Sequence, residues 1–234
     1  MIKMISRIVA AAWLLLAAAP AMAQEQPPRV AVSGNVTLAS DYRFRGVSLT
    51  STDAALQGGV NFAGRSGFSG GLWASTLSAG GTGAQLELDL FAAKSFSWKG
   101  ASIAAGGIGY LYPGASGLAD GEATLSVARP IGPVDLTVGA NYAPRQANLG
   151  RRDNIYVFSN AAAPLGKIGK TPITAAAGLG YESGVFAFGK DKLDWTVRLT
   201  ASKFGFDLSL AYIDTNVDNR LTRGRAVVSL SRSF

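Results

Sequence analysis

Apolar and polar side chains alternate, one residue after another, in many short segments of this chain, and this alternation limits its fold more than any other feature. In the segment 206–214, Phe206, Leu208 and Leu210 alternate with Asp207 and Ser209. Successive side chains of a β-strand point to opposite faces, so a period of two predicts strands with one apolar and one polar face. About 9–11 residues are enough for a tilted strand to cross a bilayer.

The chain is apolar overall, yet its apolar residues are dispersed. Hydrophobic residues make up 48% of the sequence and charged residues only 16%, against about 25% charged in a typical soluble domain. After residue 23, no apolar run reaches the roughly 20 residues that a membrane-spanning helix needs. A membrane β-barrel fits both facts, because it spreads lipid-facing side chains over alternate positions of many strands. A soluble periplasmic barrel is the alternative, and it would need polar outer faces.

Residues 1–23 have the organisation of a secretory signal peptide. A basic start is followed by an apolar run over 8–19 and then by small residues. We predict cleavage between Ala23 and Gln24, which leaves 24–234 as a single barrel domain. An uncleaved membrane anchor is the alternative interpretation.

Twelve segments show the strand pattern, and together they predict an all-β, transmembrane, antiparallel up-and-down barrel. An even number of strands brings both termini to the same side of the membrane. Links after even-numbered strands are mostly brief, apart from the link 164–172, and links after odd-numbered strands are longer, as expected of periplasmic turns and outer loops. The predicted strands are 32–46, 54–63, 68–76, 85–96, 101–112, 122–129, 134–143, 154–163, 173–182, 192–202, 206–214 and 223–234.

The C-terminus carries a separate signal. Val228, Leu230 and Phe234 share one face of the last predicted strand, and the chain ends on an aromatic residue. Such an ending is the kind that the barrel-assembly machinery reads. A terminal Phe that arose by chance would not also have this spacing. We therefore expect the protein in the bacterial outer membrane, among outer-membrane lipid and lipopolysaccharide.

Four pieces of the segment 34–76 form a recognisable motif. They are LASDYRFRG at 38–46, ALQGG at 55–59, GF at 67–68 and WAS at 73–75. These pieces resemble the TorF family of porin-type outer-membrane proteins, and the remainder of the chain is similar mainly in length and strand rhythm. The resemblance implies a porin-like barrel and transfers no catalytic or substrate-binding residues.

Charged residues on the polar faces are the candidates for pore lining. Two arginines on the first predicted strand and two on the last would meet when the barrel closes, which predicts a basic cluster at the outer side of the lumen. The fourth predicted strand carries Glu87 and Asp89 on its inward face. Opposed basic and acidic walls would select among solutes by charge. The predicted pore-lining residues are Asp41, Arg43, Arg45, Glu87, Asp89, Arg198, Arg223 and Arg225.

Two other interpretations of these charges remain open. Inward charges of a small barrel often pair with one another and fill its interior. Asp194 and Arg198, on one face of the tenth predicted strand, would form such a structural pair. Alternatively, Arg45 and Arg223 would contact lipopolysaccharide phosphates.

Composition limits the chemistry further. The chain contains no Cys and no His, so it has neither a thiolate nor the general base that most hydrolases use. We expect no enzymatic activity, cofactor or metal. The formal charge of +7 is scattered rather than clustered, so nucleic-acid binding is not expected. The predicted function is a channel for passive diffusion of small polar or charged solutes. A structural or adhesion barrel with a filled lumen is the alternative.

Overall fold

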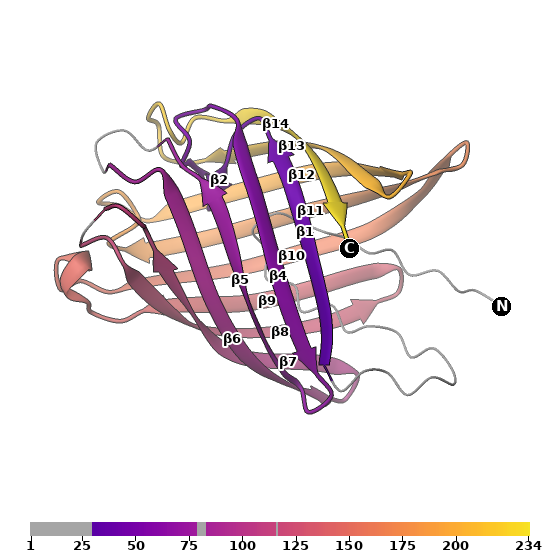
Figure 1. The fold of residues 1–234 in the computed structure, drawn as a ribbon, viewed down its shortest axis with the longest axis horizontal. Helices are drawn as coiled ribbons and strands as arrows, with labels where there is room; N and C mark the ends of the chain where they lie inside the picture. Colours follow the sequence, from indigo (N-terminus) through magenta and orange to yellow (C-terminus); the bar gives the residue numbers. More distant parts are fainter. Residues whose placement is uncertain (1–29, 79–82, 116) are drawn as a thin grey trace.

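The chain folds into a closed barrel of antiparallel strands, seen in a computed structural model that describes residues 30–78, 83–115 and 117–234 (Figure 1). The signal peptide and its cleavage site lie outside the described residues. The predicted fold class and the count of twelve wall strands are confirmed. The wall strands are β1 (Val30–Ala39), β4 (Ala55–Gly64), β5 (Phe68–Thr76), β6 (Leu86–Trp98), β7 (Ala101–Leu111), β8 (Asp120–Ile131), β9 (Val134–Ala143), β10 (Asn154–Ile168), β11 (Thr171–Gly184), β12 (Lys192–Lys203), β13 (Phe206–Thr215) and β14 (Arg225–Ser233).

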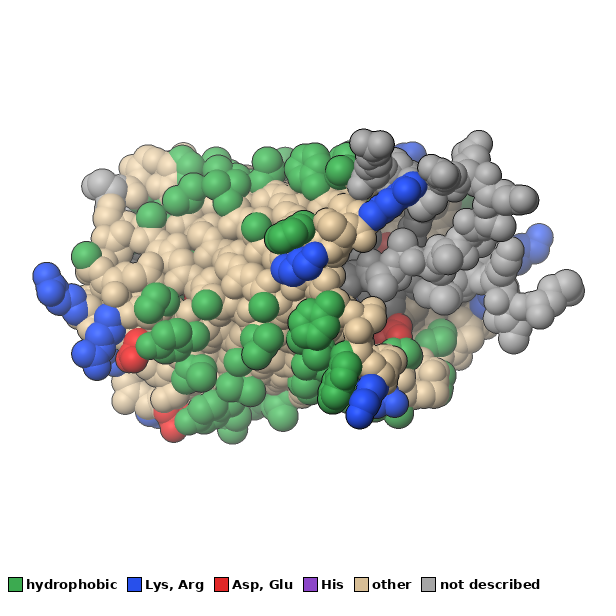
Figure 2. Space-filling model, turned by 90° about the horizontal axis from the view of Figure 1, so that it is seen from below, with side chains coloured by type: hydrophobic (Ala, Val, Ile, Leu, Met, Phe, Trp, Pro, Cys, Tyr) green, Lys and Arg blue, Asp and Glu red, His purple; other side chains and the backbone are tan. Residues whose placement is uncertain are grey.

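The wall strands other than β7 expose large apolar side chains on their outward face. Leu56, Leu179 and Leu210 are 56%, 54% and 54% exposed, whereas Gln57 and Glu87 on neighbouring inward positions are buried. Apolar side chains cover the wall between the two ends of the barrel (Figure 2). An outward apolar band around a polar interior is typical of barrels that stand in lipid. No helix in the described part of the chain is long and apolar enough to cross a membrane.

The two ends of the barrel differ in their connections. One end, the turn end, has turns of two or three residues, such as 65–67 and 204–205. The opposite end, the loop end, has longer links, such as 144–153 and 216–224. This confirms the predicted asymmetry. The predicted long link at 164–172 is wrong, because β10 and β11 extend through it and leave only a two-residue turn between them.

The predicted first strand is wrong beyond Ala39. There the backbone leaves the wall and forms a separate hairpin from β2 (Arg43–Phe44) and β3 (Val47–Ser48). Arg45 and Gly46 make its turn with φ angles of 48° and 82°, the positive values that a type I′ hairpin turn requires. We call residues 40–54, which include this hairpin, the inner loop.

The barrel closes along a short seam between β1 and β14. Five residue pairs join these strands, whereas ten join β1 to β4. The Gly34 N–H donates to the Phe234 carbonyl at 2.9 Å, and the Phe234 N–H donates to the Gly34 carbonyl at 3.0 Å. A Cβ on Gly34 would lie 2.6 Å from the Phe234 ring. The terminal aromatic ring therefore lies over the space that this glycine leaves, at the edge of the seam.

Candidate functional site in the barrel lumen

Asp41 organises the inner loop from within. Its Oδ1 accepts hydrogen bonds from Ser48 Oγ at 2.6 Å and Thr50 Oγ1 at 3.0 Å. Its Oδ2 accepts from Arg43 Nε at 2.8 Å, and the side chains of this ion pair are only 4% and 0% exposed. Arg43 Nη1 also donates to the Gly46 carbonyl at 3.1 Å. The loop thus has a polar core of its own and holds a defined shape.

Arg45, at the tip of the hairpin, connects the inner loop to the wall. Its guanidinium binds both carboxylate oxygens of Glu122 on β8, at 2.9 and 2.5 Å, and Oε1 of Glu182 on β11 at 2.7 Å. The side chains of all three residues are at most 4% exposed. Bidentate, charge-assisted bonds of this kind fix geometry as well as adding energy. We call Arg45, Glu122 and Glu182 the clamp.

A second layer of side chains supports the clamp. Lys192 Nζ lies 2.5 Å from Glu182 Oε2, and Asn154 Nδ2 donates to Glu182 Oε1 at 2.9 Å. Tyr110 donates its phenol proton to Glu122 Oε2 at 2.9 Å. The Tyr156 ring lies 4.2 Å from the Arg45 guanidinium carbon, in cation–π contact. Partners from β7, β10 and β12 therefore hold the clamp.

Burial and nearby charge fix the protonation states in the inner loop. Burial alone lowers the pKa of the Arg45 guanidinium, but Glu122, Tyr110 and Glu182 outweigh it and hold this pKa above its ordinary value. Burial, followed by the carboxylates of Glu87 and Asp89, raises the pKa of the Tyr42 phenol well above its ordinary value. Arg45 thus stays charged and Tyr42 neutral over the physiological pH range.

The other side of the inner loop packs on β5 and β6. Tyr42 meets Trp73 edge to face, with ring centroids 5.3 Å apart. This contact explains why Trp73 occupies the inward face of its strand. Glu87 and Asp89 also face inward on β6, as predicted, and are 1% and 7% exposed. Glu87 Oε2 and Asp89 Oδ1 have no hydrogen-bond partner among the described residues.

The half of the lumen nearer the turn end is different. Its inward positions carry mainly small hydroxyl and amide side chains, with the carboxylates Asp135 and Asp207 near the rim; the small residues include Asn35, Asn61, Thr174, Ser209 and Ser229. Thr200 and Ser209 share a hydrogen bond of 2.8 Å across β12 and β13. Arg198 stands on the same inward face of β12. No ion pair to Arg198 is found in the part of the chain that the structure describes.

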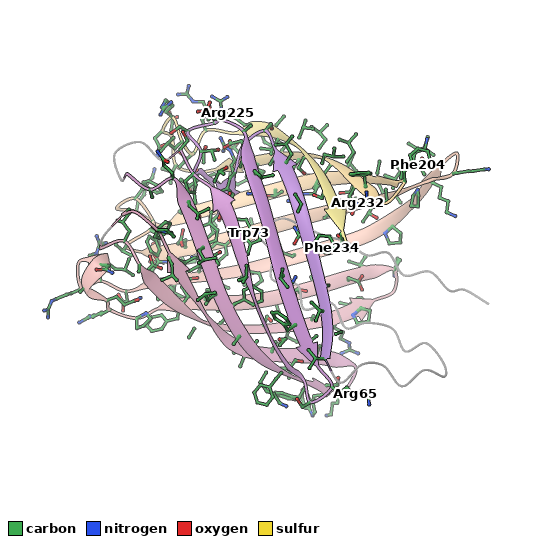
Figure 3. The ribbon with its side chains drawn as sticks, in the orientation of Figure 1. Arg65, Trp73, Phe204, Arg225, Arg232 and Phe234 are labelled. Atoms are coloured by element: carbon green, nitrogen blue, oxygen red, sulfur yellow. The ribbon has the colours of Figure 1, made fainter. Side chains whose placement is uncertain are left out.

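The prediction that four arginines form a basic cluster at the outer side of the lumen is wrong. Arg43 and Arg45 leave the wall with the inner loop and pair with carboxylates, and the burial of Arg45 excludes contact with lipopolysaccharide. Arg223 precedes β14, and its side chain is 71% exposed beside Asp218 at 3.4 Å. Arg225 is exposed at the loop end (Figure 3). The four side chains therefore differ in burial and in partner.

The predicted pair of Asp194 and Arg198 is also wrong. Asp194 Oδ1 instead accepts a hydrogen bond from the Tyr156 phenol at 3.2 Å. Sequence reasoning missed Glu122, Glu182 and Lys192 as members of the lumen network. One signal could have found them: each is a charged residue on the polar face of its strand, near the loop end.

A closed twelve-strand barrel with an apolar outside and a polar lumen is the fold of bacterial outer-membrane barrels. The chain belongs to the Gcw_chp family, described as "Bacterial protein of unknown function", whose family model matches residues 23–233. No curated protein sequence matches the chain.

Solved porin structures are similar in fold. A KdgM porin has a TM-score of 0.59 at 11% identity, over 86% of this chain and 99% of the porin. A KdgM porin in complex with disordered oligogalacturonate has a TM-score of 0.55 at 12% identity, over 87% and 98%. The NanC porin has a TM-score of 0.56 at 9% identity, over 87% and 99%. At these identities the likeness shows the fold alone.

Proposed function

We propose that the protein is a porin-like channel of the bacterial outer membrane for passive diffusion of small polar or charged solutes. One observation carries the proposal: an apolar wall encloses a polar lumen, and the inner loop folds inside it, held by the clamp. A loop held inside a barrel narrows the passage and leaves the wall intact. The fold shared with KdgM and NanC porins supports this function, as does the resemblance to the TorF family.

The arrangement of charges favours weak selection rather than tight binding. Most lumen cations are already paired: Arg43 with Asp41, and Arg45 and Lys192 with glutamates. Arg198 is the lumen cation without such a partner among the described residues, and the carboxylates Glu87 and Asp89 have no cation partner among them either. A single charge at about 4 Å in water contributes only about 1 kcal/mol. We therefore expect a modest charge preference, of the kind that charged pore linings give, rather than tight binding of one solute.

The orientation follows from the connections. Short turns of such barrels face the periplasm and long loops face outward. We assign the turn end to the periplasm and the loop end to the cell exterior. The exposed arginines of the loop end, such as Arg223, then lie at the level of lipopolysaccharide, and Phe234 is the residue that the assembly machinery would read.

A barrel with a filled lumen, serving structure or adhesion, is the second candidate. The nearly complete burial of the clamp favours it, because tightly paired side chains occupy the loop-end half of the lumen. Under this alternative the inner loop would be a permanent plug.

Conductance separates the two candidates. The full chain would be purified in detergent, refolded and inserted into a planar bilayer, with heat-denatured protein as the matched control. We expect discrete current steps and a reversal potential, measured across a salt gradient, that indicates only mild charge selectivity. Silent bilayers, with folded barrel verified by its heat-dependent shift on a detergent gel, would favour the plug.

A further inference from the structure

Outward charges are distributed differently at the two ends of the barrel. At the turn end, the two described carboxylates, Asp135 and Asp207, stand on inward positions of β9 and β13. At the loop end, outward tyrosines instead bond to aspartates, as Tyr212 does to Asp214 at 3.0 Å. The outer surface of the turn end is therefore basic without a compensating carboxylate in the described residues.

Four cations of the turn end lie over aromatic rings. Their nitrogen or guanidinium carbon lies 4.3 to 5.1 Å from a ring centroid in each of four cases. The pairs are Lys94 on Phe68, Lys99 on Trp98, Lys203 on Phe204 and Arg232 on Phe206. Figure 3 shows Arg65, Phe204 and Arg232 toward this end, away from Arg225. Aromatic and basic side chains together are typical of a membrane–water interface.

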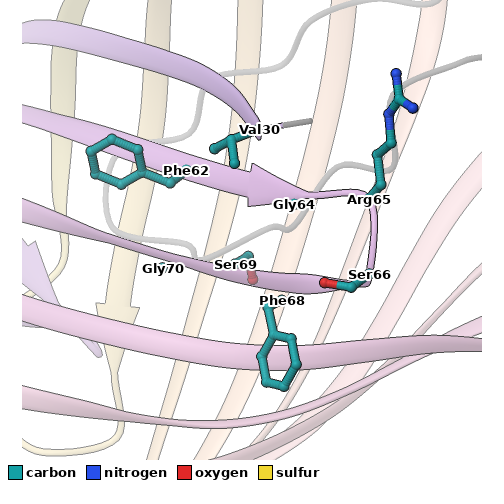
Figure 4. A pocket seen from close by; sticks show the side chains of 8 residues that line it. All are labelled: Val30, Phe62, Gly64, Arg65, Ser66, Phe68, Ser69 and Gly70. Carbon is teal, nitrogen blue, oxygen red and sulfur yellow. The ribbon is translucent and has the colours of Figure 1, made fainter. Parts of the chain in front are cut away.

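One groove at this end combines the two features. It lies beside the turn between β4 and β5, is bordered by Val30, Phe62 and Phe68, and has a volume of about 500 Å³ (Figure 4). Gly70 pairs with Phe62 across the two strands. Because Gly70 and Gly64 have no side chains, the outward surface between the apolar residues is hollow.

The groove ends at polar and basic groups. Arg65 and Ser66 line it within the turn, and Arg65 makes no ion pair in the described ranges. Lys94 stands over the Phe68 ring at 4.3 Å and donates a hydrogen bond to the Ser66 carbonyl. The turn at the end of the apolar groove thus has Arg65, which extends away from Phe68, and Lys94, which lies at Ser66 (Figure 4).

We propose that this groove binds an anionic glycerophospholipid, with an acyl chain along Val30, Phe62 and Phe68 and the phosphate between Arg65 and Lys94. Apolar walls match the chain, and uncompensated positive charge matches the phosphate, because each basic residue near an anionic headgroup contributes about 1 kcal/mol. The site rests on the membrane placement of the proposed function, but it does not depend on conduction.

Native mass spectrometry of the full chain from mixed phosphatidylcholine and phosphatidylglycerol micelles tests the site. We expect preferential retention of phosphatidylglycerol. The double variant Arg65→Gln/Lys94→Gln should lose that preference by a factor on the order of ten. Phe68→Ala should weaken the preference for phosphatidylglycerol, because it removes an apolar border of the groove and the aromatic ring over which Lys94 lies.

The matched control is Arg151→Gln/Arg152→Gln, which removes the same charge from the loop end. It should keep the wild-type preference. Equal retention of both lipids by the wild type, an equal loss in the control, or displacement of phosphatidylglycerol by added lipid A would overturn the proposal. A barrel that conducts but shows no lipid preference refutes only the proposed lipid site. A barrel that retains the lipid preference but does not conduct refutes only the proposed channel function.

Discussion

The two halves of the lumen use polar side chains in opposite ways. Toward the loop end, charged groups are numerous, buried and paired, with Arg45 held by Glu122 and Glu182. Toward the turn end, most inward side chains are small hydroxyls and amides, Arg198 stands among them, and Asp135 and Asp207 lie near the rim. Charged side chains that are buried and paired with one another are not available to interact with a solute, however many there are. Under the proposed channel function, the paired half would set the width of the passage, and Arg198 would be the cation that a solute meets in the other half.

The largest effect is expected when the clamp is broken. Arg45→Ala leaves Glu122 and Glu182 buried without their cation, and removing one partner of a buried pair costs about 3–5 kcal/mol. The inner loop should leave the lumen, so single-channel conductance should rise several-fold and the heat-dependent gel shift should occur at a lower temperature. Arg223→Ala, which removes an exposed arginine, is the control and should change neither. Unchanged conductance in Arg45→Ala would refute the assignment of the clamp.

A smaller effect is expected at the opposite side of the inner loop. Trp73→Ala removes the edge-to-face contact with Tyr42, and such pairs contribute about 0.5–1.5 kcal/mol beyond the buried area. The loop should fluctuate more, which would appear as more frequent flickering between current levels at nearly unchanged mean conductance. Trp98→Ala, at an exposed position of the turn end, gives the matched comparison. Equal noise in both variants would argue against a role for Trp73 in holding the loop.

The smallest effect is expected in the half of the lumen nearer the turn end. Arg198→Gln removes positive charge without breaking an ion pair, so stability and conductance should stay close to wild type. The reversal potential under a salt gradient should shift toward cation preference, because the lumen has lost its uncompensated cation. Arg129→Gln, on an outward position of β8, is the control. A shift of equal size in the control would place the source of selectivity outside the lumen.

The strands of the wall could be predicted from the sequence because each alternates apolar and polar residues along its own length. In β12, Leu193, Val197 and Leu199 alternate with Asp194 and Arg198, and the structure keeps each on its predicted face. The outer side of the barrel is uniform, so a period of two is sufficient to orient every strand. The same uniformity explains why the pattern predicts the correct number of twelve wall strands although several strand ends differ in the structure.

The inner loop could not be predicted in the same way. Residues 40–46 continue the alternation of β1, so their pattern cannot be distinguished from that of a longer strand. What draws Arg45 inward is a pair of glutamates 77 and 137 positions further along the chain. The turn at Arg45 and Gly46 also requires a positive φ at a residue that is not glycine, which costs roughly 1–3 kcal/mol. Distant electrostatic partners, which local periodicity does not contain, offset this cost.

The short seam has a consequence for the order of assembly. Thr37 and Ser231 hydrogen-bond across it at 2.9 Å although 194 positions separate them, while every other junction in the wall joins consecutive wall strands. Contacts between remote positions form slowly because the intervening chain must first be ordered. The cylinder can therefore become continuous only after its last residues have been synthesised, and a chain truncated at its end would remain an open sheet with two unprotected edges.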